Sequence, residues 1–74
     1  MQNLISISYQ GEMVTIETVL VGHDIQFKVN FDHPVFLEKE LDEEGAEYWI
    51  EVGIGATLRA KELGEIIEEH PEFI

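Results

Sequence analysis

The side chains best suited to chemistry in this sequence are its three histidines, and their positions keep two of them far apart. His23-Asp24 and Asp32-His33 lie at the two ends of one short apolar stretch, residues 25–31. As a strand, that stretch separates the two pairs by roughly 23 Å, at about 3.3 Å per residue. Within one monomer they therefore cannot share a metal ion or a catalytic triad. Each pair is expected in a turn, where its aspartate bonds the nearby backbone.

Other patterns of catalysis or cofactor binding are incomplete. Ser6 and Ser8 lie on an alternating stretch with no histidine near them in sequence, and cysteine is absent. The glycines of residues 53–55 lack the third glycine and the parallel βαβ context of a dinucleotide fingerprint. The acids between residues 38 and 47 lack the ligand spacing of a calcium loop. We therefore expect no enzyme and no cofactor, and keep a weak divalent-cation-binding protein as an alternative.

Composition bounds the class of protein. The sequence has 74 residues with 16 acids against 4 bases, a formal net charge of −12, and 45% apolar residues. Residues 1–74 are expected to form one small folded domain. Its charge repels phosphate backbones and anionic lipids, so neither nucleic-acid nor membrane binding is expected. The lack of cysteine, and of a basic and apolar leader in residues 1–10, favours a cytoplasmic protein.

The clearest structural signal is a β-hairpin over residues 12–31 with its turn at Gly22-His23. In this register Val19 meets Gln26 on one face, whereas Leu20 faces Ile25 and most of the large apolar residues share the other. A slip of one residue would move them to the polar face, so the pattern fixes the register. A glycine at the first turn position suits the tight turns of hairpins.

Two further hairpins extend this one. A strand at 3–9 sets Ile7 against Val14 and joins the same apolar face. A three-residue turn after Phe31 sets a strand at 35–41 with Val35 opposite Phe31.

The last hairpin pairs 35–41 with 46–52 and has two possible registers. A four-residue loop places Lys39 opposite Tyr48, on the apolar face; a type I turn with a glycine bulge shifts the pairing by one. The first register is preferred because it separates apolar from acidic side chains.

A helix is predicted over residues 58–69, with Thr57 as its N-cap. Its bases lie near its start and its acids near its end, against the helix dipole, so packing on the sheet must hold it. Gly64 is expected to permit a close approach to that sheet. The predicted fold is α+β: a five-stranded antiparallel meander, strongly twisted or curled into a half-barrel, with one C-terminal helix on its apolar face. The expected strands are about 3–9, 12–21, 24–31, 35–41 and 46–52.

The preferred register places an aromatic pair, Trp49 and Phe36, as diagonal neighbours on the sheet face that the helix leaves open. A rim of carboxylates surrounds the pair: Glu38, Glu47 and Glu51. Aromatic residues inside a polar rim are typical of an interface hot spot. The alternative is that a bulged register turns one aromatic residue into the core.

These features favour a small, acidic, non-enzymatic interaction module that binds a basic protein partner through the outer sheet face. The alternative in another class is a mimic of nucleic acid that inhibits a DNA- or RNA-binding protein. A homodimer is also expected, because one helix about 10 Å wide cannot cover a five-stranded apolar face.

Overall fold

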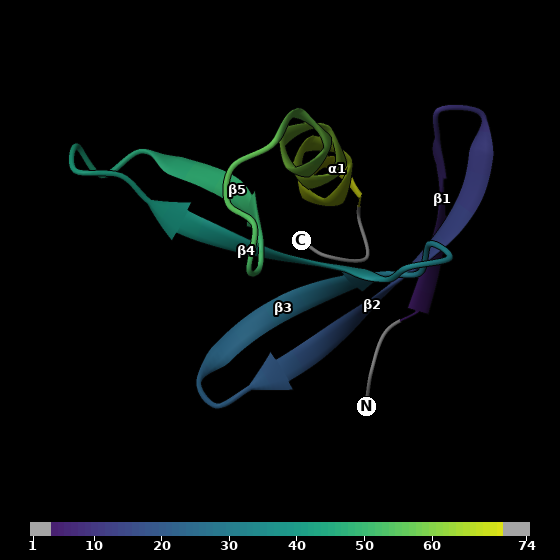
Figure 1. Cartoon of the computed structure of the whole chain (residues 1–74), viewed down its shortest axis with the longest axis horizontal. Coiled ribbons are helices and arrows are strands. Elements are labelled where there is room, and N and C mark those ends of the chain that lie inside the picture. Colours follow the sequence, from purple (N-terminus) through teal and green to yellow (C-terminus); the bar gives the residue numbers. More distant parts are fainter. Residues whose placement is uncertain (1–3, 71–74) are drawn as a thin grey trace.

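Five antiparallel strands in sequential order and one helix make up residues 4–70, the part of the chain that the computed structural model describes (Figure 1). The elements are β1 (Leu4–Tyr9), β2 (Glu12–Val21), β3 (Asp24–Val29), β4 (Val35–Leu41), β5 (Glu47–Glu51) and α1 (Leu58–Glu69). The predicted α+β meander with a C-terminal helix is confirmed. Asn3, in the predicted first strand, and Pro71, after the helix, lie outside the described residues.

The register of β1, β2 and β3 is the predicted one. Ile16 pairs with Ile5 on one side and Val29 on the other, and Leu20 pairs with Ile25. Gly22 takes a positive φ of 62° in the turn between β2 and β3. The alternation of apolar and polar residues is therefore enough to fix this half of the sheet.

The connection between β3 and β4 is longer than the predicted three-residue turn. Val29, and not Phe31, pairs with Val35. The cause is Asn30, whose backbone N–H donates to the Thr15 carbonyl at 2.9 Å and whose side-chain amide donates to the Thr15 hydroxyl at 2.9 Å. The chain thus stays beside β2 through Asn30. The error amounts to two residues, so apolar side chains still meet on one face.

The preferred register of the β4–β5 hairpin is wrong, and the bulged alternative holds. Lys39 pairs with Trp49, and Leu37 pairs with Glu51. The turn explains the shift: Asp42 Oδ1 accepts from the N–H groups of Glu44 at 2.8 Å and Ala46 at 2.9 Å. Gly45 takes the left-handed φ of 85° that a glycine bulge requires. Odd-numbered residues of β5 therefore face the helix.

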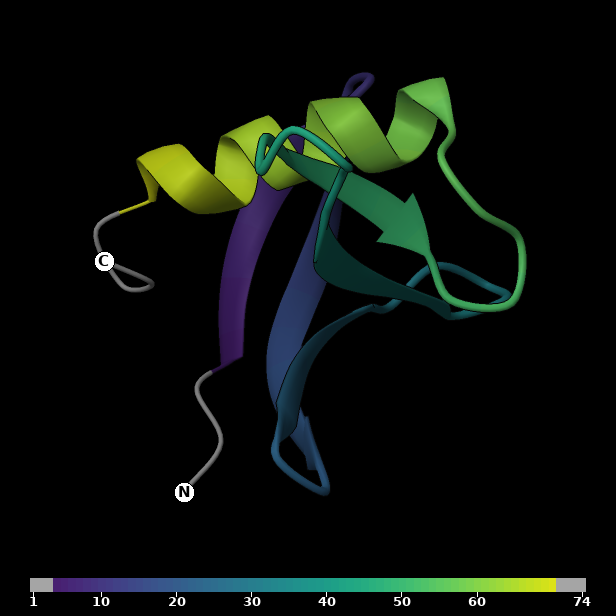
Figure 2. The same cartoon turned by 90° about the vertical axis from the view of Figure 1, so that its left-hand side faces the viewer.

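The sheet twists strongly around α1 without closing, since β1 and β5 do not pair within the described residues. Figures 1 and 2 show the helix between the β4–β5 hairpin and the start of the meander. Ala60, Leu63 and Ile67 are buried on its inner face, and the Tyr9 hydroxyl of β1 donates to Glu62 at 2.8 Å. The tip of the β2–β3 hairpin projects away from the helix (Figure 2).

The helix approaches β5 most closely at Gly64, which is buried against the indole of Trp49. A Cβ atom at this position would overlap three atoms of the ring. The expected role of Gly64 in close packing is therefore confirmed. This packing outweighs the low helix propensity of glycine.

Substitution Gly64→Ala is expected to destabilise the protein by about 1–3 kcal/mol, although alanine is the better helix former. The reason is overlap with the ring atoms of Trp49 nearest its backbone, so the cost should shrink in a Trp49→Ala background, where the ring is absent. Urea unfolding of the wild type, both single variants and the double variant measures this coupling. Equal costs of Gly64→Ala in both backgrounds would contradict the contact.

Candidate functional site

Within residues 4–70, the outer edge of β5 is unpaired along its first half. The Val52 N–H donates to the Phe36 carbonyl of β4 at 2.8 Å, so even-numbered residues here bond across the sheet. The backbone groups of Glu47, Trp49 and Glu51 consequently point to the other side. There Glu51 exchanges two 2.9 Å bonds with Gly55, whereas Glu47 and Trp49 have no backbone partner on that side among residues 4–70. This leaves a short stretch of strand edge available for pairing.

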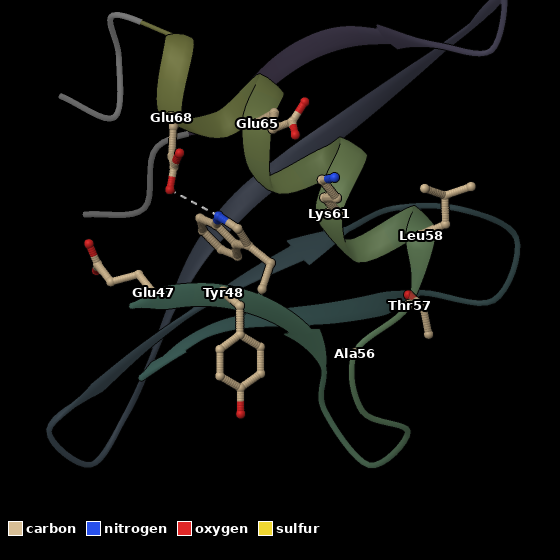
Figure 3. A pocket seen from close by; sticks show the side chains of 9 residues that line it. Glu47, Tyr48, Ala56, Thr57, Leu58, Lys61, Glu65 and Glu68 are labelled. Atoms are coloured by element: carbon tan, nitrogen blue, oxygen red, sulfur yellow. Dashed lines mark hydrogen bonds between the residues drawn. The ribbon is translucent and has the colours of Figure 1, made fainter. Parts of the chain in front are cut away.

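A groove of about 500 Å³ runs beside this free edge, between β5 and α1 (Figure 3). Residues of three segments line it: Glu47, Tyr48 and Trp49 of β5; Ala56 and Thr57 of the loop; and Leu58, Lys61, Glu65 and Glu68 of α1. Leu58 is 71% exposed and Tyr48 is 42% exposed, so apolar surface is available at this edge. The groove thus combines strand edge, apolar surface and charge.

Trp49 forms the inner wall of the groove and is only 8% exposed. Its ring meets Phe27 edge-on with centroids 5.5 Å apart, and Lys39 Nζ lies 5.4 Å from its centroid. Its Nε1 donates to Glu68 Oε1 at 3.1 Å (Figure 3). The indole is therefore held in place by packing, a cation–π contact and a hydrogen bond.

Lys39 links the charges at this end of the groove. Its ammonium lies 2.7 Å from Glu68 and 3.6 Å from Glu47. The hydrogen bond with Glu68 raises the pKa of Lys39. The same bond, together with the indole N–H, lowers the pKa of Glu68. Both groups stay charged at neutral pH. Glu68 accepts the hydrogen bond from the indole, and its ion pair with Lys39 connects it to β4.

The opposite end of the groove is held by Glu51, which is 2% exposed. Arg59 donates to both of its oxygens, at 2.6 Å from Nη2 and 3.2 Å from Nε, and the Thr57 hydroxyl donates to it as well. The Arg59 bonds are the main cause that lowers the pKa of Glu51. Thr57 Oγ1 also accepts from the Ala60 N–H at 3.0 Å, which confirms the predicted N-cap. Glu51 therefore ties the sheet to the start of α1.

The predicted aromatic pair does not exist on the outer sheet face. Trp49 and Glu51 face the helix because of the bulged register, and both are buried. Phe36 and Glu38 remain on the outer face, half-buried, where Glu38 pairs with Ile50. Of the five predicted site residues, Trp49 and Glu47 line the groove.

The remaining candidates for chemistry stay dispersed. His23 and His33 are exposed in separate connections. No three or more histidine, cysteine or acidic side chains within residues 4–70 come together in a way that could hold a metal ion. None of the helices described is long and apolar enough to cross a membrane.

Three comparisons with known proteins add nothing to these observations. No protein-family model, curated protein or solved structure matches the chain.

Sequence reasoning missed most of the groove, in part because the preferred register turned Trp49 away from the helix. The signal was present in residues 42–45, a turn sequence whose final glycine suits a bulge. Lys61, Glu65 and Glu68 recur at spacings of four and three residues along α1, which places them on one side of the helix.

Substitution Glu51→Gln is expected to cost about 1–3 kcal/mol at neutral pH, because it removes the charge that Arg59 and Thr57 satisfy. A lowered pKa stabilises the fold above the ordinary value of 4.5, and this contribution disappears as pH falls through the folded-state value. The difference in the free energy of unfolding between the wild type and the variant should therefore decrease at acidic pH. Urea unfolding at pH 7 and about pH 3 measures it. Glu43→Gln, in the exposed turn, is the control, and a gap independent of pH would contradict this role of Glu51.

Proposed function

We propose that this chain is a non-enzymatic, cytoplasmic interaction module that binds an extended, basic segment of a protein partner along the free edge of β5. The observation that carries the proposal is the combination of unpaired strand edge and adjoining groove. An extended segment added there would bond through its backbone to Glu47 and Trp49. Its alternate side chains would enter the groove toward α1 or lie beside Tyr48 on the outer face.

The charge of the groove supports a basic partner. Three of its residues are acidic, Glu47, Glu65 and Glu68, on a chain of net charge −12. Complementary charge speeds encounter and disfavours acidic competitors, while strand pairing supplies contacts that do not depend on sequence. Compared with the outer-face hypothesis, this site keeps the expected partner and moves the contact to the sheet edge.

An acetylated and amidated octapeptide of alternating valine and lysine is expected to bind, and its valine–glutamate twin is not. Trp49 is the only tryptophan in the sequence and lines the groove, so its fluorescence reports binding. Glu65→Lys should weaken binding by more than the roughly 1.4- to 5-fold that loss of one exposed charge pair costs, because it also adds repulsion. Glu43→Lys is the matched control, with the same charge change in a turn outside the groove.

N-methylation of the peptide tests strand addition directly. Methyl groups on the amides that face β5 should abolish binding, and methyl groups on the alternate amides should leave it intact. Equal effects of the two patterns, or equal effects of the Glu65 and Glu43 variants, would refute binding at this edge.

We further propose that the chain forms a homodimer, supported by apolar surface that α1 leaves uncovered. On the helix-facing side of the β2–β3 tip, Leu20 is 74% exposed and Ile25 is 51% exposed. A cleft of about 360 Å³ adjoins this tip, and Ile25, Phe27 and Ile67 contribute to its lining. A second copy that covers this surface would remove a large exposed patch from water.

Sedimentation equilibrium is expected to show a dimer that strengthens with added salt, because salt screens the repulsion between two acidic chains. Leu20→Ser should shift the mass toward that of the 8.5 kDa monomer. Met13→Ser is the matched control, since Met13 is 71% exposed on the other face of β2. A mass of one chain at high concentration and physiological salt would refute the dimer.

A further inference from the structure

Lys61 is the one base, among the four in the sequence, without an acidic partner within residues 4–70. Lys28 pairs with Glu17, Lys39 with Glu47 and Glu68, and Arg59 with Glu51. Lys61 lines the groove beside the exposed Leu58. With sixteen acids in the chain, the unpaired ammonium in this groove provides charge complementarity for a carboxylate brought by the ligand.

Charge is segregated along the groove. Trp49 bonds Glu68 near the end of α1, and Glu51 bonds Thr57 at its start, so β5 and α1 run in opposite directions. Glu47, Glu65 and Glu68 therefore lie toward the start of β5, and Lys61 lies toward its end. Along the helix axis, Lys61 and Glu65 are separated by about 6 Å, at 1.5 Å per residue.

This spacing matches an extended peptide. Side chains two residues apart on a strand share a face and are about 6.6 Å apart. A base opposite Glu65 thus places a group two residues away opposite Lys61. A base there would be repelled, and a carboxylate would be attracted.

We propose that the groove selects an extended segment in which a lysine or arginine and a carboxylate are two residues apart on the same face. This inference rests on the proposed function and narrows its ligand. The carboxylate would contact Lys61, and the base would lie among Glu65, Glu68 and Glu47. If an acidic side chain precedes the base in the segment, the segment must lie antiparallel to β5 to place both groups correctly. If the carboxylate is the C-terminus, which follows the base, the segment must lie parallel to β5. Antiparallel pairing is slightly more stable per residue, so the first order is favoured.

The test uses capped heptapeptides, with Thr-Val-Glu-Val-Lys-Val-Thr as the main probe. Replacing its glutamate by glutamine should weaken binding about 1.4- to 5-fold. Exchanging the two charged residues should also weaken it. A peptide with lysine third from a free C-terminus tests the other source of the carboxylate. This peptide is compared with its amidated twin and with the main probe. If it binds more tightly than both, the carboxylate is the C-terminus, the segment lies parallel to β5, and the antiparallel preference is wrong.

Lys61→Glu should reverse the preference, so that a probe with lysine in place of its glutamate becomes the tighter ligand. Lys28→Glu is the matched control, with the same charge change on the outer face. Thermal melting of both variants verifies folding. If the wild type binds the main probe and the probe with lysine in place of its glutamate equally, the proposed selection for a carboxylate is wrong and the proposed function stands. If no basic peptide binds at all, both are wrong.

Discussion

The packing of the Trp49 indole against Gly64 sets the position of the helix on the sheet. Because glycine has no side chain, α1 comes close enough to β5 for the indole to reach Glu68. That approach leaves the first half of the strand edge beside the helix and not beneath it, and the space between them is the groove. A larger residue at position 64 would push the helix outward and alter the groove together with the core.

Polar contacts at both ends of the groove supply charged partners for the two ends of α1. α1 carries no acid in its first turn and no base in its last, so its own sequence does not balance its dipole. The sheet contributes Glu51 beside the first turn, where it meets Thr57 and Arg59. At the other end Lys39, from β4, reaches Glu68. A helix with poor intrinsic stability is thereby fixed by groups from two neighbouring strands.

Alternation and glycine-containing turns predicted the strand order, the helix and the registers of the β1–β2 and β2–β3 pairs, because each depends on local sequence and on one buried face. The β4–β5 register depended on the turn at residues 42–46, where hydrogen bonds of Asp42 decide between two loop lengths. Segregation of apolar from acidic residues favoured the wrong choice. It assumed that Glu51 belongs in water, whereas a partner 8 residues ahead in sequence, Arg59, neutralises it in the interior.

Lys39 shows how this error could have been detected. In the preferred register it stood alone on an apolar face, the one misplaced residue of the pattern. In the observed register Glu47 and Glu51 share that face, and Lys39 pairs with Glu47 at 3.6 Å. A base on β4 and an acid on β5 each break the apolar pattern of this face, and their pairing accounts for both. The groove itself was beyond such reasoning, because its far wall comes from a helix whose placement depends on tertiary packing.

An unpaired strand edge carries a risk of uncontrolled pairing with other chains, and the surroundings of β5 limit that risk. The bonds between Glu51 and Gly55 close one end of the edge, and the turn at Asp42–Ala46 closes the other. The acidic charge of the chain disfavours the pairing of further copies along this edge. Only a short segment can therefore add to the edge, and it must accept both the adjoining helix and the charges that line it. The same constraints that protect the edge from aggregation would make it selective.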